Sequence, residues 1–507
     1  MKNTIAKNTT SLSIAGFLSK ALGAIYKIPL IKIIGQEGLG IYTIIYPVFA
    51  IFLVLGTSTF PLGISRYIIE EENNQQTLAN SMGISLIFGI IFSIIIAMLG
   101  KTLATLQGAI QYSLIYYAIS PIILISFILG TFRGYFQGFE EMKTVAISQI
   151  IEQTLKILFG IAFCIILSKQ NIVYAVTGLF LGIGLSEIVT IIWLLINFKI
   201  KNKKIDFFSK LNFKKVLSNI LPISFSGMIL PLSQTIISII ILPLVNYFSI
   251  SFATKVYGFS SGIVSSILNI PLILSSSLSM SLLPNISKKV LTKQDFSKDI
   301  SQCLKFILVF SSFFGIMFFI FAPEISDLLV NTLNFDIAPK MLVTFFRFGA
   351  ISIFYSTFLQ VFNTILQSMG KWKYSVSCLG ISAILKIGLI FILSQFEDIN
   401  MYSIFIADNI GTGIGVVFQL LYLRKLLSIK IDVKDTLLKT STILLSIVIL
   451  GLYLQKTLTL NLLTSFTKLF CVALLVVIES LFLNIFNIRK FLLVKNIQKR
   501  QIKIKNK

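Results

Sequence analysis

Long apolar runs recur along the whole of this chain, and no other feature limits its possible folds so strongly. A helix needs about 20 apolar residues to cross the roughly 30 Å hydrocarbon layer of a membrane, and many runs here reach that length. Hydrophobic residues make up 55% of the sequence and charged residues 13%, against about 25% charged in soluble domains. A soluble core cannot enclose so much apolar surface, so lipid is the expected solvent. We therefore predict an all-α polytopic membrane protein with about 14 transmembrane helices.

The first apolar run is expected to remain as a membrane helix. It is too long for a cleaved signal peptide and contains Lys20 and Lys27. The predicted spans are 12–34, 40–65, 78–100, 111–136, 143–167, 172–197, 216–245, 256–283, 300–322, 341–368, 373–394, 401–423, 436–455 and 462–487.

The 44 Lys and Arg residues are distributed unevenly between the loops. Most lie at the two termini and in the loops that follow even-numbered spans. The remaining loops hold Lys101, Lys169, Lys255, Lys340 and Lys456. Cytoplasmic loops collect basic residues, so we predict a multi-pass protein of the cell membrane with both termini cytoplasmic. The net charge of +24 is then explained by topology and by contact with anionic membrane lipids, and nucleic acid is not an expected partner.

The two halves of the chain resemble each other at an offset of about 230 residues. Leu155-Lys156-Ile157 matches Leu385-Lys386-Ile387 in the corresponding span. Each repeat holds an even number of spans, so the repeats are parallel and related by an axis along the membrane normal. The predicted organisation is an N-lobe at 1–198, a basic cytoplasmic linker at 199–215, a C-lobe at 216–430, two helices at 431–490 and a basic cytoplasmic tail at 491–507.

Cationic side chains inside or beside the spans are the candidate substrate-binding residues. A charge deep in a span costs roughly 2.5–3.5 kcal/mol on insertion scales, so it normally faces a partner or a wet cavity. Lys20 and Lys27 are two turns apart, about 10 Å along one face of a span without acids, which favours an anionic ligand. Snorkelling is the alternative for Lys27, and a bridge to a nearby acid such as Glu140 for Arg133. The full set is Lys20, Lys27, Arg66, Arg133, Lys255 and Arg347.

Acidic residues within the spans are candidates for ion pairing or coupling. Glu152 and Lys156 are spaced i and i+4 on one helix, in the orientation that favours an ion pair. Lys386 takes the matching place in the second repeat. Glu187 and Asp408, which lie in matching spans of the two lobes, are each expected to pair with a lysine.

Catalytic and metal chemistry has little support in this sequence. His is absent, and the four cysteines lie far apart in apolar stretches, as expected of inert core thiols. We therefore predict no catalytic residue, no metal site and no cofactor. Na⁺ or the membrane potential is the expected driving force for transport.

Three motifs resemble those of the polysaccharide-transport flippases. Gly35–Tyr42, Pro61–Ser65 and Arg133–Gly138 are similar to signatures of the stage V sporulation protein B and MurJ-like branch of the multidrug/oligosaccharidyl-lipid/polysaccharide exporter superfamily. The resemblance implies a MATE/MurJ-like fold of two six-helix lobes plus two C-terminal helices. It implies a transporter, not an enzyme, that flips an undecaprenyl-pyrophosphate-linked saccharide from the inner to the outer leaflet by alternating access. The saccharide is expected to be a lipid II-like cell-wall precursor or a polysaccharide repeat unit, and the transporter a monomer.

The resemblance also implies which residues meet the anionic lipid-linked saccharide. Cations of the first helices line a central cavity in the family, and the matching residues here are Lys20, Lys27 and Arg66. The family also has an arginine just before a proline that aligns with Pro271. This chain has Ser265–Ile270 there, without a cation, so either Lys255 substitutes or the first lobe holds the pyrophosphate alone.

Two rival functions make different demands on the sequence. A cation-coupled multidrug antiporter of the same fold needs a membrane carboxylate, and the first span has none. A polytopic glycan polymerase or glycosyltransferase needs an extramembrane acid pair or a sizeable outer loop, and the predicted outer loops are short. Vegetative wall, spore cortex and capsule all remain open as the biological setting.

Overall fold

The computed structural model describes residues 22–23, 26–70, 74–200, 213–245, 249–273, 294–333, 338–427 and 433–457, with isolated residues between 275 and 292 and between 467 and 479. All regular elements in these ranges are helices. Ten of the helical segments described are long and apolar enough to cross a membrane, which confirms the prediction of an all-α polytopic membrane protein. The number of fourteen helices stays a prediction.

The chain divides into two compact units. Unit 1 comprises Met1–Ser281 and Lys371–Gly415, and unit 2 comprises Leu282–Gly370 and Val416–Lys507. The predicted boundaries of the N-lobe and the C-lobe stay a prediction.

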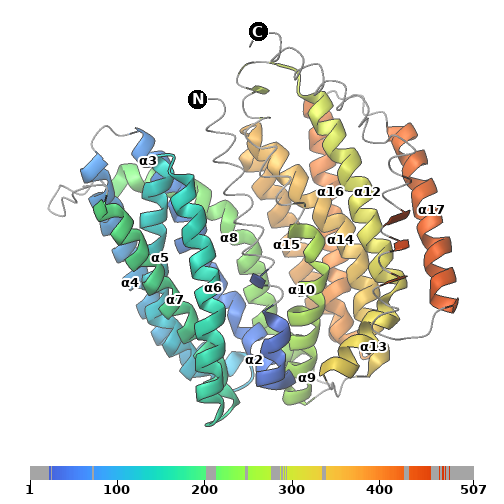
Figure 1. Cartoon of the computed structure of the whole chain (residues 1–507), viewed down its shortest axis with the longest axis horizontal. Helices are drawn as coiled ribbons and strands as arrows, with labels where there is room; N and C mark the ends of the chain where they lie inside the picture. The colour runs from blue at the N-terminus through green and yellow to red at the C-terminus, as the bar shows by residue number, and fades with distance from the viewer. Residues whose placement is uncertain are drawn as a thin grey trace, which may run out of the picture. The chain divides into compact units, whose positions relative to one another are not determined.

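Unit 1 is built from long helices that pack in pairs (Figure 1). Its helices are α2 (Lys27–Val54), α3 (Phe60–Glu70), α4 (Asn74–Leu106), α5 (Ser113–Gly138), α6 (Met142–Ser168), α7 (Ile172–Ile200), α8 (Phe213–Leu244), α9 (Ile250–Tyr257), α10 (Ser265–Leu268), α15 (Trp372–Leu393) and the first half of α16 (Ser403–Leu427). Short 3₁₀ turns are η2 (Ile110–Tyr112) and η4 (Asn400–Tyr402), and π-helical turns are η1 (Leu55–Thr59) and η3 (Gly258–Val264). Glycines bring helices together: a Cβ on Gly182 of α7 would lie 2.4 Å from the backbone N of Gly160 on α6.

Large apolar side chains are exposed on these helices. Met98 on α4 is 77% exposed and Ile384 on α15 is 71% exposed. Such surfaces are unfavourable in water, whereas a hydrocarbon environment accepts them. The exposed apolar faces are thus in keeping with a chain that folds in lipid.

A glycine separates the first two predicted spans. The backbone of α2 leaves the helical region at Gly35, where φ is 66°. Residues with a side chain rarely adopt this left-handed φ, so glycine allows the chain to change direction there. The break lies between the predicted spans 12–34 and 40–65, as the hydropathy pattern indicated.

The π-helical turn η1 interrupts the second span beside a close helix contact. The N–H of Phe60 bonds to the carbonyl of Leu55, and Pro61 has no N–H to continue the ladder. The neighbouring carbonyl, of Gly56, faces Gly130 on α5: a Cβ built on Gly130 would lie 1.8 Å from that oxygen. Only glycine at 130 therefore allows α5 to pack against η1.

We expect Gly130→Ala to destabilise the folded protein by about 3 kcal/mol, the upper part of the range for overpacked sites. The added methyl group overlaps a backbone oxygen, which cannot move as a flexible side chain would. Thermal unfolding of the purified protein in detergent measures the effect. Gly388→Ala on α15 is the matched control, because no heavy atom of the described residues lies within 4 Å of its Cβ position. Equal stability of the two variants would contradict the close contact.

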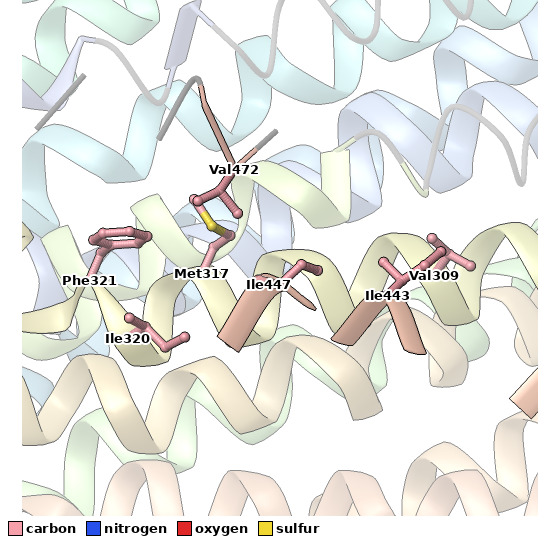
Figure 2. Close-up of a cluster of buried hydrophobic side chains, with 7 residues drawn as sticks. All are labelled: Val309, Met317, Ile320, Phe321, Ile443, Ile447 and Val472. Atoms are coloured by element: carbon pink, nitrogen blue, oxygen red, sulfur yellow. The ribbon is translucent and has the colours of Figure 1, made fainter. Parts of the chain in front are cut away.

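Unit 2 contains α12 (Ser297–Ile320), α13 (Ala322–Leu333), α14 (Pro339–Ser368), α17 (Val433–Thr457) and the end of α16. α12 packs against both α14 and α17. One buried apolar cluster joins α12 and α17 (Figure 2), and consists of Val309, Met317, Ile320, Phe321, Ile443, Ile447 and Val472. α13 is absent from the predicted spans, because its 12 residues are too few to cross a bilayer. Its Glu324 lies 3.7 Å from Nζ of Lys468, which ties α13 to the C-terminal part of the chain.

Candidate functional site

A buried ion pair joins α5 to α6 in unit 1. Nη2 of Arg133 lies 2.7 Å from Oε2 of Glu152, and Nε of Arg133 donates a 3.0 Å hydrogen bond to Oγ of Ser148. Arg133 is only 3% exposed. The arrangement has a local cause: Ser148, Glu152 and Lys156 are spaced by four residues, so one face of α6 carries all three.

A second carboxylate, that of Glu187 on α7, is completely buried in the same part of unit 1. Oγ of Ser126 on α5 lies 2.9 Å from Oε1 and 2.8 Å from Oε2 of this residue. The charged groups that act on Glu187 are Glu152, Lys156 and Arg133. Because buried charges need nearby countercharges or hydrogen-bond donors, the four groups form one electrostatic cluster.

Lys27 completes the cluster, and Lys156 also contacts α2. Nζ of Lys156 lies 5.8 Å from the centre of the Tyr46 ring, a cation–π contact between α6 and α2. Nζ of Lys27 donates hydrogen bonds to the carbonyl oxygen of Gly262 at 3.1 Å and to Oγ of Ser266 at 2.6 Å. The charges of Lys27 and Lys156 repel each other. We call these five residues the polar cluster: Lys27, Arg133, Glu152, Lys156 and Glu187.

The Lys27 contact falls where the family resemblance implies an arginine. Gly262 belongs to η3, and π-helical bonding leaves carbonyl groups for donors from outside the helix. Ser266 belongs to the stretch Ser265–Ile270, which has no cation of its own. Lys27 at the start of α2 therefore brings positive charge to this stretch. Lys255, the expected substitute, is half-buried in the last turn of α9.

The ion pairing of α6 differs from the prediction. The partner of Glu152 is Arg133 on α5 and not Lys156 on its own helix. A buried cross-helix pair to a guanidinium is geometrically favoured, because Arg presents several donors in a fixed plane. Sequence reasoning also missed the roles of Ser126, Ser148 and Ser266. The four-residue spacing of Ser148 from Glu152 was the one available signal.

A separate ion pair joins α15 to α16. Nζ of Lys386 lies 2.6 Å from Oδ1 of Asp408, and the two side chains are 20% and 22% exposed. The helices meet closely here, since a Cβ on Gly411 would lie 2.9 Å from the carbonyl oxygen of Ser382. Asp408 thus has a lysine partner, as the sequence predicted, whereas Glu187 is bonded to a serine.

We expect Lys386→Leu and Asp408→Leu each to lower the amount of folded protein, because either change leaves one charge unpaired in a membrane helix. Insertion scales assign roughly 2.5–3.5 kcal/mol to such a charge, and partial exposure reduces it. The double substitution removes both charges and should restore most of the folded yield. Fluorescence-detected size-exclusion chromatography of the extracted variants gives the comparison. A double variant worse than either single variant would show that the pair has another role.

The remaining candidate residues belong to different parts of the chain. Arg66 is exposed near the end of α3 in unit 1, and Arg347 belongs to unit 2, where its guanidinium lies 5.6 Å from the centre of the Phe319 ring. Lys20 lies outside the described residues. Within the described part of the chain, no group of three or more His, Cys, Asp or Glu could hold a metal ion. Substrate binding by any of the candidate residues stays a prediction.

The sequence matches a known family over most of its first half and beyond. The model of the family described as "Polysaccharide biosynthesis protein" matches residues 5–290. The chain is also 27% identical over 467 residues to stage V sporulation protein B of Bacillus subtilis (strain 168), covering 88% of each chain.

Solved structures share the fold at low sequence identity. The lipid II flippase MurJ in an inward closed conformation has a TM-score of 0.72 and 14% identity, over 95% of this chain and 99% of that one. A multidrug resistance MATE family transporter in an inward-facing conformation has a TM-score of 0.68 and 15% identity, over 83% of this chain and 94% of that one. These likenesses confirm the predicted MATE/MurJ-like fold.

Proposed function

Because this chain belongs to the polysaccharide biosynthesis protein family, we propose that it moves an undecaprenyl-pyrophosphate-linked saccharide from the inner to the outer leaflet of the cell membrane. It is a multi-pass membrane transporter of the multidrug/oligosaccharidyl-lipid/polysaccharide exporter superfamily and not an enzyme. The cargo is a lipid II-like precursor or a polysaccharide repeat unit. The protein works as a monomer by alternating access.

The observation that carries this proposal is the charge balance of the polar cluster. Three cations, Lys27, Arg133 and Lys156, lie with two carboxylates in the membrane-spanning part of unit 1. A site with excess positive charge attracts a pyrophosphate and repels a cationic drug. An ammonium group has three donors, and Lys27 uses two of them on described residues, so one remains for a phosphate oxygen.

The membrane potential favours the proposed direction. With both termini in the cytoplasm, the pyrophosphate would bind from the inside and leave on the outside. An inside-negative potential assists outward movement of an anion by about 2.3 kcal/mol per charge per 100 mV. The cations of the polar cluster partly neutralise the headgroup while it is in the membrane.

The test uses the purified full-length protein in proteoliposomes with a fluorescent polyprenyl-pyrophosphate-linked disaccharide. A membrane-impermeant quencher reports the fraction of headgroups in the outer leaflet over time. We expect exchange between leaflets in proteoliposomes and none in protein-free vesicles. An imposed potential should change the final distribution towards the positive side. Equal accessibility with and without protein would refute the proposed function.

A cation-coupled multidrug antiporter is the second candidate, because Glu187 is a buried membrane carboxylate bonded to a serine hydroxyl. This function predicts that cells lacking the protein accumulate a cationic dye and that Glu187→Gln fails to restore its efflux. Normal dye efflux in such cells, together with accumulation of a lipid-linked saccharide precursor, would decide for the flippase.

A further inference from the structure

An apolar cavity of about 100 Å³ lies within unit 1. Its walls come from three parts of the unit: the second span, α4 and the first half of α8. The lining residues are Leu55, Phe60, Phe88, Phe92, Leu217, Ile220, Ser224 and Met228. Three phenylalanines on two helices give the cavity an aromatic wall, in which the Phe60 and Phe88 ring centres are 5.8 Å apart.

The cavity suits an apolar occupant. Ser224 provides the only hydroxyl of the lining, and its Oγ is 3.1 Å from Oγ1 of Thr59, to which it is hydrogen-bonded. A water molecule needs two or more polar partners, and the lining offers one hydroxyl that is already hydrogen-bonded, so the cavity favours apolar atoms over water. The volume is somewhat smaller than the roughly 150 Å³ of an apolar cavity that takes up benzene, so it holds a few carbon atoms of a chain, and its apolar lining disfavours sugar and phosphate.

Cationic residues follow the cavity at one end. The second span and α8 pack antiparallel here: Thr59 at the end of η1 contacts Ser224, and a Cβ on Gly63 of α3 would lie 2.6 Å from Ile220. In the same register, Arg66 lies one helical turn beyond Gly63, towards the end of α3, and it is exposed. The facing end of α8 begins Phe213-Lys214-Lys215. In this register Arg66 and the basic start of α8 lie beyond one end of the apolar cavity, the end predicted to face the cytoplasm.

We propose that this cavity binds a segment of the isoprenoid chain of an anionic diphosphate lipid, while the diphosphate lies at the level of Arg66. The proposal rests on the proposed function and adds to it a binding place for the lipid part of the cargo. Charge complementarity selects this occupant: an apolar chain ending in two phosphates matches an apolar cavity beyond whose end the chain carries basic residues. The cavity admits the cargo from the inner leaflet before the headgroup reaches the polar cluster.

Photolabelling of the purified protein in phosphatidylcholine nanodiscs tests the proposal. The probe is a polyprenyl diphosphate without sugar that carries a diazirine in its chain, and peptide mass spectrometry locates the label. We expect label on α4 near Phe88 and Phe92 and on α8 between Leu217 and Met228, displaced by unlabelled polyprenyl diphosphate. A phosphatidylglycerol with a diazirine in its acyl chain should label these positions weakly.

Two substitutions sharpen the test. Met228→Trp fills the cavity and should reduce labelling about tenfold, the effect of excluding about two methylene groups. Met98→Trp on α4 is the control, because Met98 is 77% exposed away from the cavity lining and should leave labelling unchanged. If Met228→Trp does not fold, displacement of the probe by unlabelled polyprenyl diphosphate in the unmodified protein still tests the proposal.

The outcomes distinguish this proposal from the proposed function. Equal labelling by the phosphatidylglycerol probe, without competition by polyprenyl diphosphate, would show that bulk lipid occupies the cavity and would overturn the proposal. Headgroup exchange in proteoliposomes without label in the cavity would overturn it while the flippase function stands. Competed label in the cavity without headgroup exchange would support the binding place and refute the flippase.

Discussion

Lys27→Gln should reduce headgroup translocation about 100-fold, which corresponds to about 3 kcal/mol. Lys27 combines the two features that a pyrophosphate site needs: positive charge between membrane helices and a donor left over after its bonds to Gly262 and Ser266. Glutamine retains hydrogen bonding and removes the charge. The fluorescent disaccharide lipid in proteoliposomes measures the rate at equal protein content.

Lys32→Gln is the matched control for this experiment. Lys32 lies five residues further along the same segment and is exposed, so we expect a rate close to that of the unmodified protein. Lys27→Arg retains the charge and should recover part of the activity lost in Lys27→Gln. An unchanged translocation rate in Lys27→Gln would contradict a role of Lys27 in pyrophosphate binding. Its contact with η3 would then be purely structural.

The second large effect is expected at the Arg133–Glu152 pair. Arg133→Leu leaves the carboxylate of Glu152 without its 2.7 Å partner, in a place where both side chains are largely buried. Removing one member of a buried ion pair costs about 3–5 kcal/mol, whereas replacing both by apolar residues is often neutral. We therefore expect strong destabilisation in Arg133→Leu and in Glu152→Leu, and near-normal thermal unfolding in the double variant.

The double variant also separates folding from transport. If the positive charge of Arg133 contributes to pyrophosphate binding, the double variant should be stable but should translocate the headgroup more slowly than the unmodified protein. Lys143→Leu, an exposed lysine near the start of α6, controls for the loss of any cation from this region and should affect neither property. If the double variant unfolds as readily as the single variants, the pair stabilises the protein through more than the neutralisation of its two charges.

Some of the site could be predicted because it depends on spacing within one helix. The separation of Glu152 and Lys156 predicts that they share one face of α6, and the charge of Lys27 in an apolar run predicts a polar partner or a wet cavity. The partners of these residues could not be predicted. The donor groups of Lys27 reach Gly262 and Ser266, which are 235 and 239 positions away.

The sequence by itself determined the solvent of this protein, its all-helical class and the positions of most spans, because hydropathy accumulates along the chain and each membrane helix satisfies its own backbone. Only the tertiary structure decided that Arg133 and not Lys156 pairs with Glu152, that Lys27 reaches η3, and that an apolar cavity lies between the second span, α4 and α8. Such contacts depend on how each helix is rotated and shifted against its neighbours. The closest helix contacts, such as that of Gly130 with Gly56, depend on the volumes of side chains from two different helices. The composition of one helix does not specify which residue of another helix it will meet.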